Sequence, residues 1–129
     1  MEIKNGRLIS GWRVKPKKSS EDRKAWARAL ARAVTCQKLL HGKGWKRRVW
    51  HNHGSWHWAL DNGGIAVGPE SWDNDPPYTA RPSDPLAFWV MDYEPYNNDP
   101  NVAIRKAIAY MEKKVAELQA RIDIARKAL

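Results

Sequence analysis

The sequence predicts an α+β fold, in which an antiparallel sheet of about four strands is flanked by an N-terminal helix and a long C-terminal helix of coiled-coil type. Apolar side chains recur at helical spacing in residues 19–41 and 99–129. Between them, residues 46–93 contain short apolar segments bounded by glycine- and proline-rich turns, which is the pattern of strands. The chain of 129 residues fits one domain, residues 1–129, with its own hydrophobic core.

The N-terminal segment, residues 1–18, is predicted to form a small hairpin and a basic linker. Asn5-Gly6 favours a type I′ turn between two short strands. The linker that follows, RVKPKK at 13–18, contains a proline that resists regular secondary structure.

Residues 19–41 are predicted to form the first helix. Ser19 and Asp22 make a variant of the capping box at its start, and Gly42 and Gly44 end it. The predicted apolar stripe of this helix consists of Trp26, Leu30, Ala33, Val34, Gln37 and Leu40.

Residues 46–67 are predicted to form a three-stranded antiparallel meander. Gly54-Ser55 fits a type II′ turn and Asn62-Gly63 fits a type I′ turn. The first turn sets the opposed pairs His53–Trp56, Asn52–His57, His51–Trp58, Trp50–Ala59, Val49–Leu60 and Arg48–Asp61. The predicted core face carries Val49, His51, His53, Trp56, Trp58, Leu60, Ile65 and Val67. The opposite face carries Arg48, Trp50, Asn52, His57, Ala59, Asp61 and Ala66.

After the meander, residues 69–85 are predicted to be an acidic, proline-rich loop, and residues 87–93 a fourth strand. Asp92 and Glu94 alternate onto one face of that strand, as an acid–base pair would. Because the sequence has no nucleophile motif or phosphate loop to accompany them, exposed strand-end carboxylates are the simpler interpretation.

The C-terminal helix, residues 99–129, begins at an Asp99-Pro100 cap. Its length of about 45 Å exceeds the width of a domain of this size. We therefore expect a homo-oligomer built partly on residues 104–129, although the first helix of the same chain is an alternative partner. A parallel dimer is disfavoured, because Arg121 would face Arg126. The predicted seam consists of Ile104, Ile108, Met111, Val115, Leu118, Ile122, Ala125 and Leu129.

The net charge of +9 is unevenly distributed. Residues 1–48 carry 15 Lys/Arg against 3 Asp/Glu, whereas residues 69–100 carry one arginine against seven acidic residues. This asymmetry favours an anionic partner on the basic side, either a small ligand or nucleic acid. The alternative is that the two regions neutralise each other within the fold.

Composition excludes several classes of protein. The single cysteine, Cys36, forms no internal disulfide, and no CxxC pair is present. The start, MEIKNGRL, lacks the pattern of a signal peptide, and the longest apolar run, residues 86–91, is too short to span a membrane. We expect a soluble protein of the cytoplasm that does not insert into a membrane.

The four histidines do not predict a metal site. His57 is expected on the opposite face from His51 and His53, and His41 lies at the end of the first helix. The letters HNH at 51–53 are adjacent in one strand, unlike the scattered residues of the nuclease motif of that name. Residues 73–75 (DND) resemble part of a calcium loop without its glycine and distal glutamate. No metal or cofactor is predicted.

The candidate binding site is the face that carries Trp50. In the predicted register the indole lies beside Ala59 and Ala66, which leaves a shallow shelf for a nucleobase. Lys46, Arg47 and Arg48 would hold phosphate, and Asn52 and His57 would bond the polar edges of the ligand. The structural alternative is that a helix covers this face and Trp50 fills the space above the alanines.

The segment GWKRRVWHNHGSWHWALDNGGIAV resembles small accessory proteins encoded by bacteriophages. The residues that carry the resemblance are Gly44, Trp45, Arg48, Val49, Trp50, Trp56, His57, Ile65 and Val67. The resemblance implies a context of antagonism to host defence, through a blocked protein effector or a sequestered nucleotide signal. It transfers no catalytic residues to this chain.

These observations favour a non-enzymatic binding protein that captures a small anionic nucleotide in a basic, tryptophan-lined pocket. One alternative is a nucleic-acid-binding protein that uses the basic N-terminal half. Another is an inhibitor that blocks a protein effector of host defence through exposed tryptophans and the acidic segment. A further alternative is a hydrolase that acts on a nucleotide through Asp92, Glu94 and the histidines.

Overall fold

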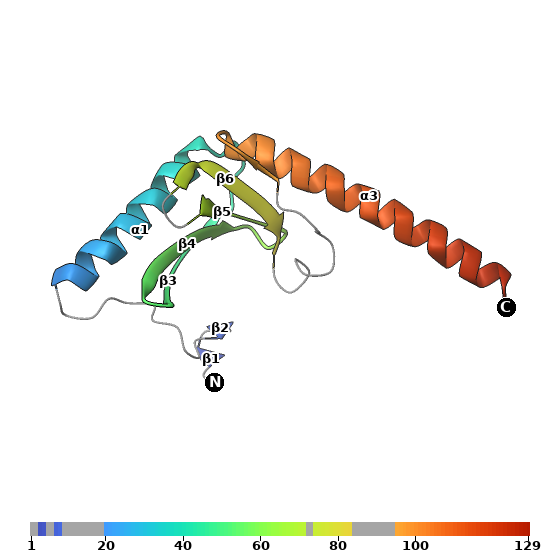
Figure 1. The fold of residues 1–129 in the computed structure, drawn as a ribbon, viewed down its shortest axis with the longest axis horizontal. Coiled ribbons are helices and arrows are strands. Elements are labelled where there is room, and N and C mark those ends of the chain that lie inside the picture. The colour runs from blue at the N-terminus through green and yellow to red at the C-terminus, as the bar shows by residue number, and fades with distance from the viewer. Residues whose placement is uncertain (1–2, 5–6, 9–19, 72–73, 84–94) are drawn as a thin grey trace.

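The computed structural model describes residues 3–4, 7–8, 20–71, 74–83 and 95–129 (Figure 1). Its helices are α1 (Ser20–Leu39) and α3 (Pro100–Lys127). A small hairpin pairs β1 (Ile3–Lys4) with β2 (Arg7–Leu8), as predicted around Asn5-Gly6. The main sheet has five antiparallel strands in the order β3 (Lys46–Asn52), β4 (Ser55–Asp61), β5 (Ile65–Ser71), β6 (Asn74–Pro82) and β7 (Tyr96–Asn97).

The predicted α+β class is confirmed, and among the described residues the sheet has five strands where about four were expected. Helix α1 packs against β3 and β4, whereas the beginning of α3 packs against β6 and β7. The two helices meet where α1 ends and α3 begins (Figure 1).

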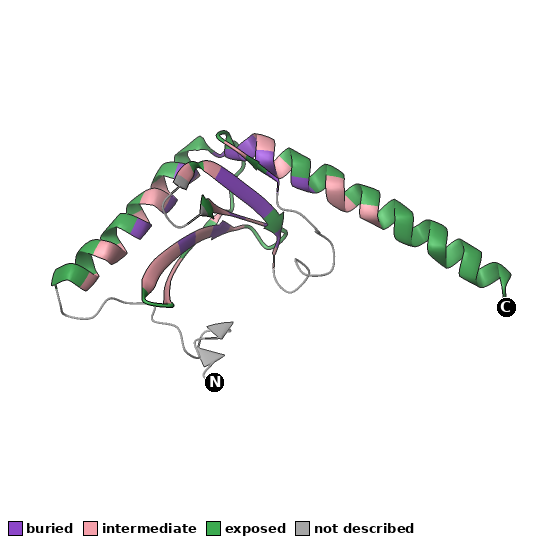
Figure 2. Cartoon of the chain, in the orientation of Figure 1, coloured by how far each residue is buried: buried purple, intermediate pink, exposed green. Residues whose placement is uncertain are grey.

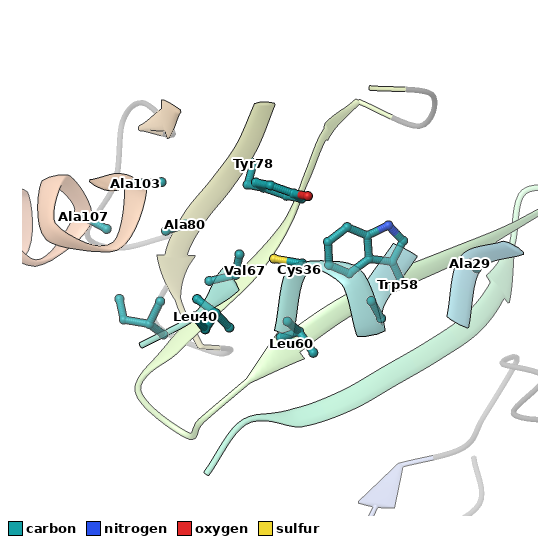
Figure 3. Packing of buried hydrophobic residues seen from close by; sticks show 12 residues of the cluster. Ala29, Cys36, Leu40, Trp58, Leu60, Val67, Tyr78, Ala80, Ala103 and Ala107 are labelled. Atoms are coloured by element: carbon teal, nitrogen blue, oxygen red, sulfur yellow. The ribbon is translucent and has the colours of Figure 1, made fainter. Parts of the chain in front are cut away.

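The hydrophobic core lies between α1, the first two turns of α3 and one face of the sheet (Figure 2). Trp58 and Tyr78 form an edge-to-face pair, with ring centroids 6.2 Å apart, next to Cys36 of α1 (Figure 3). The fully or nearly fully buried apolar residues are Ala29, Ala33, Cys36, Leu40, Trp58, Leu60, Ile65, Val67, Tyr78, Ala80, Ala103 and Ala107.

Helix α1 is rotated from the predicted orientation. Ala33 and Leu40 of the predicted stripe are buried, but the other buried positions are Ala29 and Cys36. The larger Trp26 and Leu30 are only half-buried. Small side chains allow the helix to approach the large rings that the sheet presents, so burial follows size here rather than hydrophobicity alone.

The predicted β3–β4 register is wrong. The two-residue loop is His53-Gly54, with φ of 50° and 77°, and not Gly54-Ser55. These positive φ angles are those of a type I′ turn, which matches the twist of the strands. The observed pairs are Arg47↔Leu60, Arg48↔Ala59, Val49↔Trp58, Trp50↔His57, His51↔Trp56 and Asn52↔Ser55. Because the partner of each residue shifts by two positions, the side chains that stay in the ladder keep their predicted faces. His53 does not, because it lies in the turn and is exposed instead of pairing with Trp56 on the core face.

The second turn differs in the same way. Leu60 pairs with Val67, so Gly63 and Gly64 form the loop in place of Asn62-Gly63. The Asn62 side chain accepts hydrogen bonds from the backbone N–H groups of Gly64 and Ile65, at 2.9 and 2.8 Å. Asn62, the residue that precedes the loop, therefore stabilises the turn through its side chain.

The loop predicted at 69–85 is wrong, because residues 65–71 and 74–82 form the hairpin β5–β6. Prolines suggested a loop, since they cannot donate to a strand ladder. Here β6 pairs with β7 only at Tyr78 and Thr79, so Pro76, Pro77 and Pro82 lie beyond that shared segment. The strand predicted at 87–93 lies outside the described residues.

Asn101 joins the end of α1 to the start of α3. Its side chain donates to the Leu39 carbonyl at 2.8 Å and accepts from the His41 N–H at 3.0 Å. Asp99 caps α3 as predicted and accepts from the Asn101 backbone N–H at 2.9 Å. Asn101 is only 7% exposed, so these polar groups satisfy one another where water has little access.

We expect Asn101→Ala to lower the free energy of unfolding by about 2 kcal/mol, because it leaves the partners at Leu39 and His41 unsatisfied. Urea unfolding followed by circular dichroism measures this change. The control is Asn98→Ala, at an exposed position nearby, for which we expect less than about 0.5 kcal/mol. Equal effects of the two substitutions would contradict the assigned role of Asn101.

The second half of α3 extends away from the sheet, and every residue from 115 to 129 is exposed (Figure 2). The predicted seam is therefore solvent-accessible beyond Met111 in the single chain. In the part of the chain that the structure describes, neither helix combines the length and the apolar composition needed to span a membrane.

Candidate ligand-binding face

The candidate site lies on the face of β3 and β4 that points away from α1. Alternation along β3 places Lys46, Arg48, Trp50 and Asn52 on this face, because Val49 packs against the core. On β4 it carries His57, Ala59 and Asp61. We call these seven residues the outer face. The predicted site residue Arg47 is exposed but belongs to the opposite side of the strand.

Trp50 and His57 form a stacked pair at the centre of the outer face. They are directly opposed in the ladder, and their rings lie 5.7 Å apart with an interplanar angle of 21°. The His57 Nε2 atom is 3.0 Å from the Asn52 carbonyl oxygen, which fixes the orientation of the imidazole. The aromatic surface is therefore a two-ring platform.

The predicted alanine shelf beside Trp50 is wrong. Ala59 is opposed to Arg48, and Ala66 is opposed to Asp61. The shift by two residues moves the small side chains away from the indole and puts a ring in their place. The site residues stay on one face, but their neighbours change.

Arg48 is bound to Asp61, which limits its availability for a ligand. The guanidinium Nη1 is 3.4 Å from the carboxylate, which also accepts from the Ser83 hydroxyl at 2.7 Å and the Gly63 N–H at 2.8 Å. Burial acts to raise the pKa of Asp61, but the hydrogen bonds and the charge of Arg48 outweigh it, so that the pKa is lowered. Asp61 therefore holds Arg48 in place as an ionised group.

We expect Asp61→Asn to destabilise the protein by about 1 kcal/mol at neutral pH. The folded-state pKa is lowered, so the stabilisation is present above the ordinary pKa of about 4 and is lost as pH falls through the folded-state value. Urea unfolding at pH 7 and at about pH 2.5 should show the difference between wild type and variant shrinking in acid. Glu70→Gln, at an exposed carboxylate of β5, is the control. A pH-independent difference would contradict the role of the ionised carboxylate.

The histidines of the hairpin occupy both sides of the sheet, as the sequence predicts. His51 packs edge-to-face on Trp56 on the core side, with centroids 5.3 Å apart, whereas His57 lies on the outer face. Trp56 in turn donates from Nε1 to Asp22 of α1 at 3.0 Å. Within the described part of the chain, no three potential metal ligands lie together. Asp92 and Glu94 lie outside the described residues.

An ion pair joins α1 to β6, and it is a contact between the basic and the acidic region of the kind that the charge asymmetry left open. Arg32 Nε is 3.1 Å from Asp75, whose side chain is 6% exposed, so Asp75 contributes a structural contact. In the sequence, the only signal for the Arg32–Asp75 ion pair is the opposite charge of two distant segments. Burial raises the pKa of Asp75, against the opposing effect of Arg32.

The pKa of Cys36 is raised to about 12, mainly by burial and secondly by the negative charge of Asp75. The thiol therefore stays protonated at neutral pH and is not a nucleophile.

Comparison with protein-family models, curated proteins and solved structures finds no match to this chain. The geometry of the outer face is therefore the basis for assigning a function.

Proposed function

We propose that the chain is a non-enzymatic binding protein that captures a small anionic nucleotide on the outer face. The observation that carries the proposal is the Trp50–His57 stack, which lies on the same face as Lys46 and Arg48. An aromatic platform and adjacent cations match the base and the phosphate of a nucleotide.

The base would extend the Trp50–His57 stack or replace His57 in it. Every nucleobase presents a π-face, so stacking supplies affinity with little dependence on base identity. The Asn52 side-chain amide, in the same strand as Trp50, offers donors and an acceptor for the edge of the base.

The phosphate would be held by Lys46 and Arg48, whereas Arg47, on the opposite side of the strand, takes no part. Lys46 is exposed, whereas Arg48 would exchange or share its contact with Asp61 when an anion binds. Weakening the Arg48–Asp61 ion pair offsets part of the free energy that Arg48 gains from the phosphate. We therefore expect Lys46 to contribute as much to the affinity as Arg48, although Arg48 lies closer to Trp50 in the strand.

Isothermal titration against cyclic di- and trinucleotides and ADP-ribose derivatives tests the proposal. We expect Trp50→Ala to weaken binding about 10- to 100-fold and Trp50→Phe to retain most of it, because the phenyl ring still stacks. Lys46→Ala should weaken binding about fivefold, whereas Lys43→Ala, at an exposed position before β3, should not. Absence of binding to every member of the panel would overturn the proposal.

The resemblance to phage accessory proteins supplies the biological setting that we propose. Capture of a nucleotide messenger in the cytoplasm of an infected host would suppress a defence response that depends on it. Stoichiometric binding without turnover suffices for this role, so the proposal requires no catalytic residue.

A second candidate function, binding of nucleic acid, is favoured by the charge on α1. Lys24, Arg28 and Lys38 are exposed; Lys24 and Lys38 lie opposite the buried residues of the helix, and Arg28 lies on its flank. A row of cations on a helix can follow a phosphate backbone, in addition to the cations of β3.

If nucleic acid is the ligand, affinity for a single-stranded oligonucleotide should fall steeply with salt, and mononucleotides should bind weakly. Replacing Lys24, Arg28 and Lys38 by Gln should reduce the slope of log K against log salt by about 0.7 for each phosphate that the variant no longer neutralises. Fluorescence anisotropy over a salt series measures both quantities. An unchanged slope in the triple variant would exclude α1 as the binding surface.

A further inference from the structure

The apolar seam of α3 is exposed over its second half. Ile104 and Met111 are partly buried against the core, but Val115 is 66%, Leu118 57% and Ile122 44% exposed. These side chains recur at alternating spacings of three and four residues, so they lie along one side of the helix. A continuous exposed stripe of branched apolar side chains indicates an interface.

We propose that residues 111–129 of α3 pair in antiparallel orientation with the same segment of a second copy of the chain. The pairing forms a two-stranded coiled coil with a two-fold axis level with residue 120. The layers of its core are Met111 with Leu129, Val115 with Ala125, and Leu118 with Ile122, each occurring twice by symmetry.

The flanking charges favour this arrangement. In antiparallel coiled coils, the residues beside the seam meet their equivalents on the same side of the interface. In the proposed register, Glu112 of each chain lies next to Arg126 of the second copy, which gives two opposite-charge pairs. Gln119 lies next to its own symmetry mate near the axis.

The other orientation is electrostatically unfavourable. In a parallel dimer Arg121 lies next to Arg126 of the second copy, twice, and Glu112 lies next to Ala107. The parallel arrangement thus has repulsive pairs without a compensating attraction.

Sliding the antiparallel pair by one heptad is also worse. One direction puts Lys114 next to Arg121 and Arg105 next to Arg126 of the second copy. The other direction leaves Val115 outside the interface, although it is among the most exposed apolar residues of the helix. The proposed register is the one that covers Val115 and pairs opposite charges.

One repulsion stays in the proposed register, because Arg121 meets its own symmetry mate. Glu117 precedes Arg121 by four residues on the same helix, a spacing at which the two side chains are neighbours. The carboxylate of Glu117, which also contacts Lys114 at 3.4 Å, therefore offsets part of this repulsion.

Sedimentation equilibrium of the full chain tests the assembly. We expect a mass twice that of the 14.8 kDa chain, and a rise of about 100-fold in the dimer Kd for Leu118→Asp. Ile124→Asp is the matched control, because Ile124 is 68% exposed but lies off the seam. Circular dichroism checks that both variants stay folded, which their exposure leads us to expect. A monomeric wild type would overturn the proposal, even if it bound a different protein through α3. Equal effects of Leu118→Asp and Ile124→Asp would overturn it as well.

Cysteine cross-linking tests the orientation and the register. Gln119→Cys should form a disulfide-linked dimer on mild oxidation, because the two positions meet near the axis only in the antiparallel register. Arg126→Cys and Ala120→Cys are the controls and should not cross-link, since the first faces Glu112 and the second points outward. Cross-linking at 120 or 126 in preference to 119 would contradict the proposed pairing.

The charge pair supplies an independent test. Arg126→Glu alone should raise the dimer Kd about tenfold by placing like charges together, and adding Glu112→Arg to the same chain should restore it. A double variant as weak as the single one would show that the two side chains do not meet across the interface.

Discussion

The hydrogen bonds of Asn101 fix the position of the two helices relative to each other, and the rest of the fold depends on that position. Its amide joins the last carbonyl of α1 to the chain just before β3, while its backbone is capped by Asp99. Ala103 and Ala107 then lie against β6 in the same core as Ala33 and Cys36. The Asn101 amide donates to the Leu39 carbonyl and to the Asp99 carboxylate and accepts from the His41 N–H, so another arrangement of the helices would leave a polar group unsatisfied.

This geometry determines which face of β3 and β4 becomes the candidate site. Helix α1 covers the face that carries Trp58 and Leu60, so alternation along the strands presents Trp50 and His57 on the other. The small residues of α1 pack against the large rings on this face of the sheet, because bulky groups on both elements would overpack the core. The outer face is thus a consequence of core packing.

The sequence predicts the fold class, both long helices and the division of the hairpin into two faces, because these depend on periodicity and on the parity of the turns. It does not predict the ladder partners, since His53-Gly54 and Gly54-Ser55 are both plausible loops and differ by two positions in register. That difference replaces Ala59 by His57 beside Trp50 and so changes the character of the site. The sequence does not predict the β5–β6 hairpin, because prolines indicate a loop; among the described residues, they lie outside the short segment in which β6 also pairs with β7.

The proposed dimer and the proposed binding site are compatible because the charge of the chain is concentrated away from the seam. Residues 111–129 carry five Lys/Arg and three Asp/Glu, whereas residues 1–48 carry 15 and 3. A parallel dimer would bring the two basic halves together. The antiparallel register separates the two Met111 positions by about 27 Å along the helix axis, well beyond the screening length of about 8 Å at physiological salt. The orientation that pairs the flanking charges of α3 therefore also keeps the two basic N-terminal halves apart.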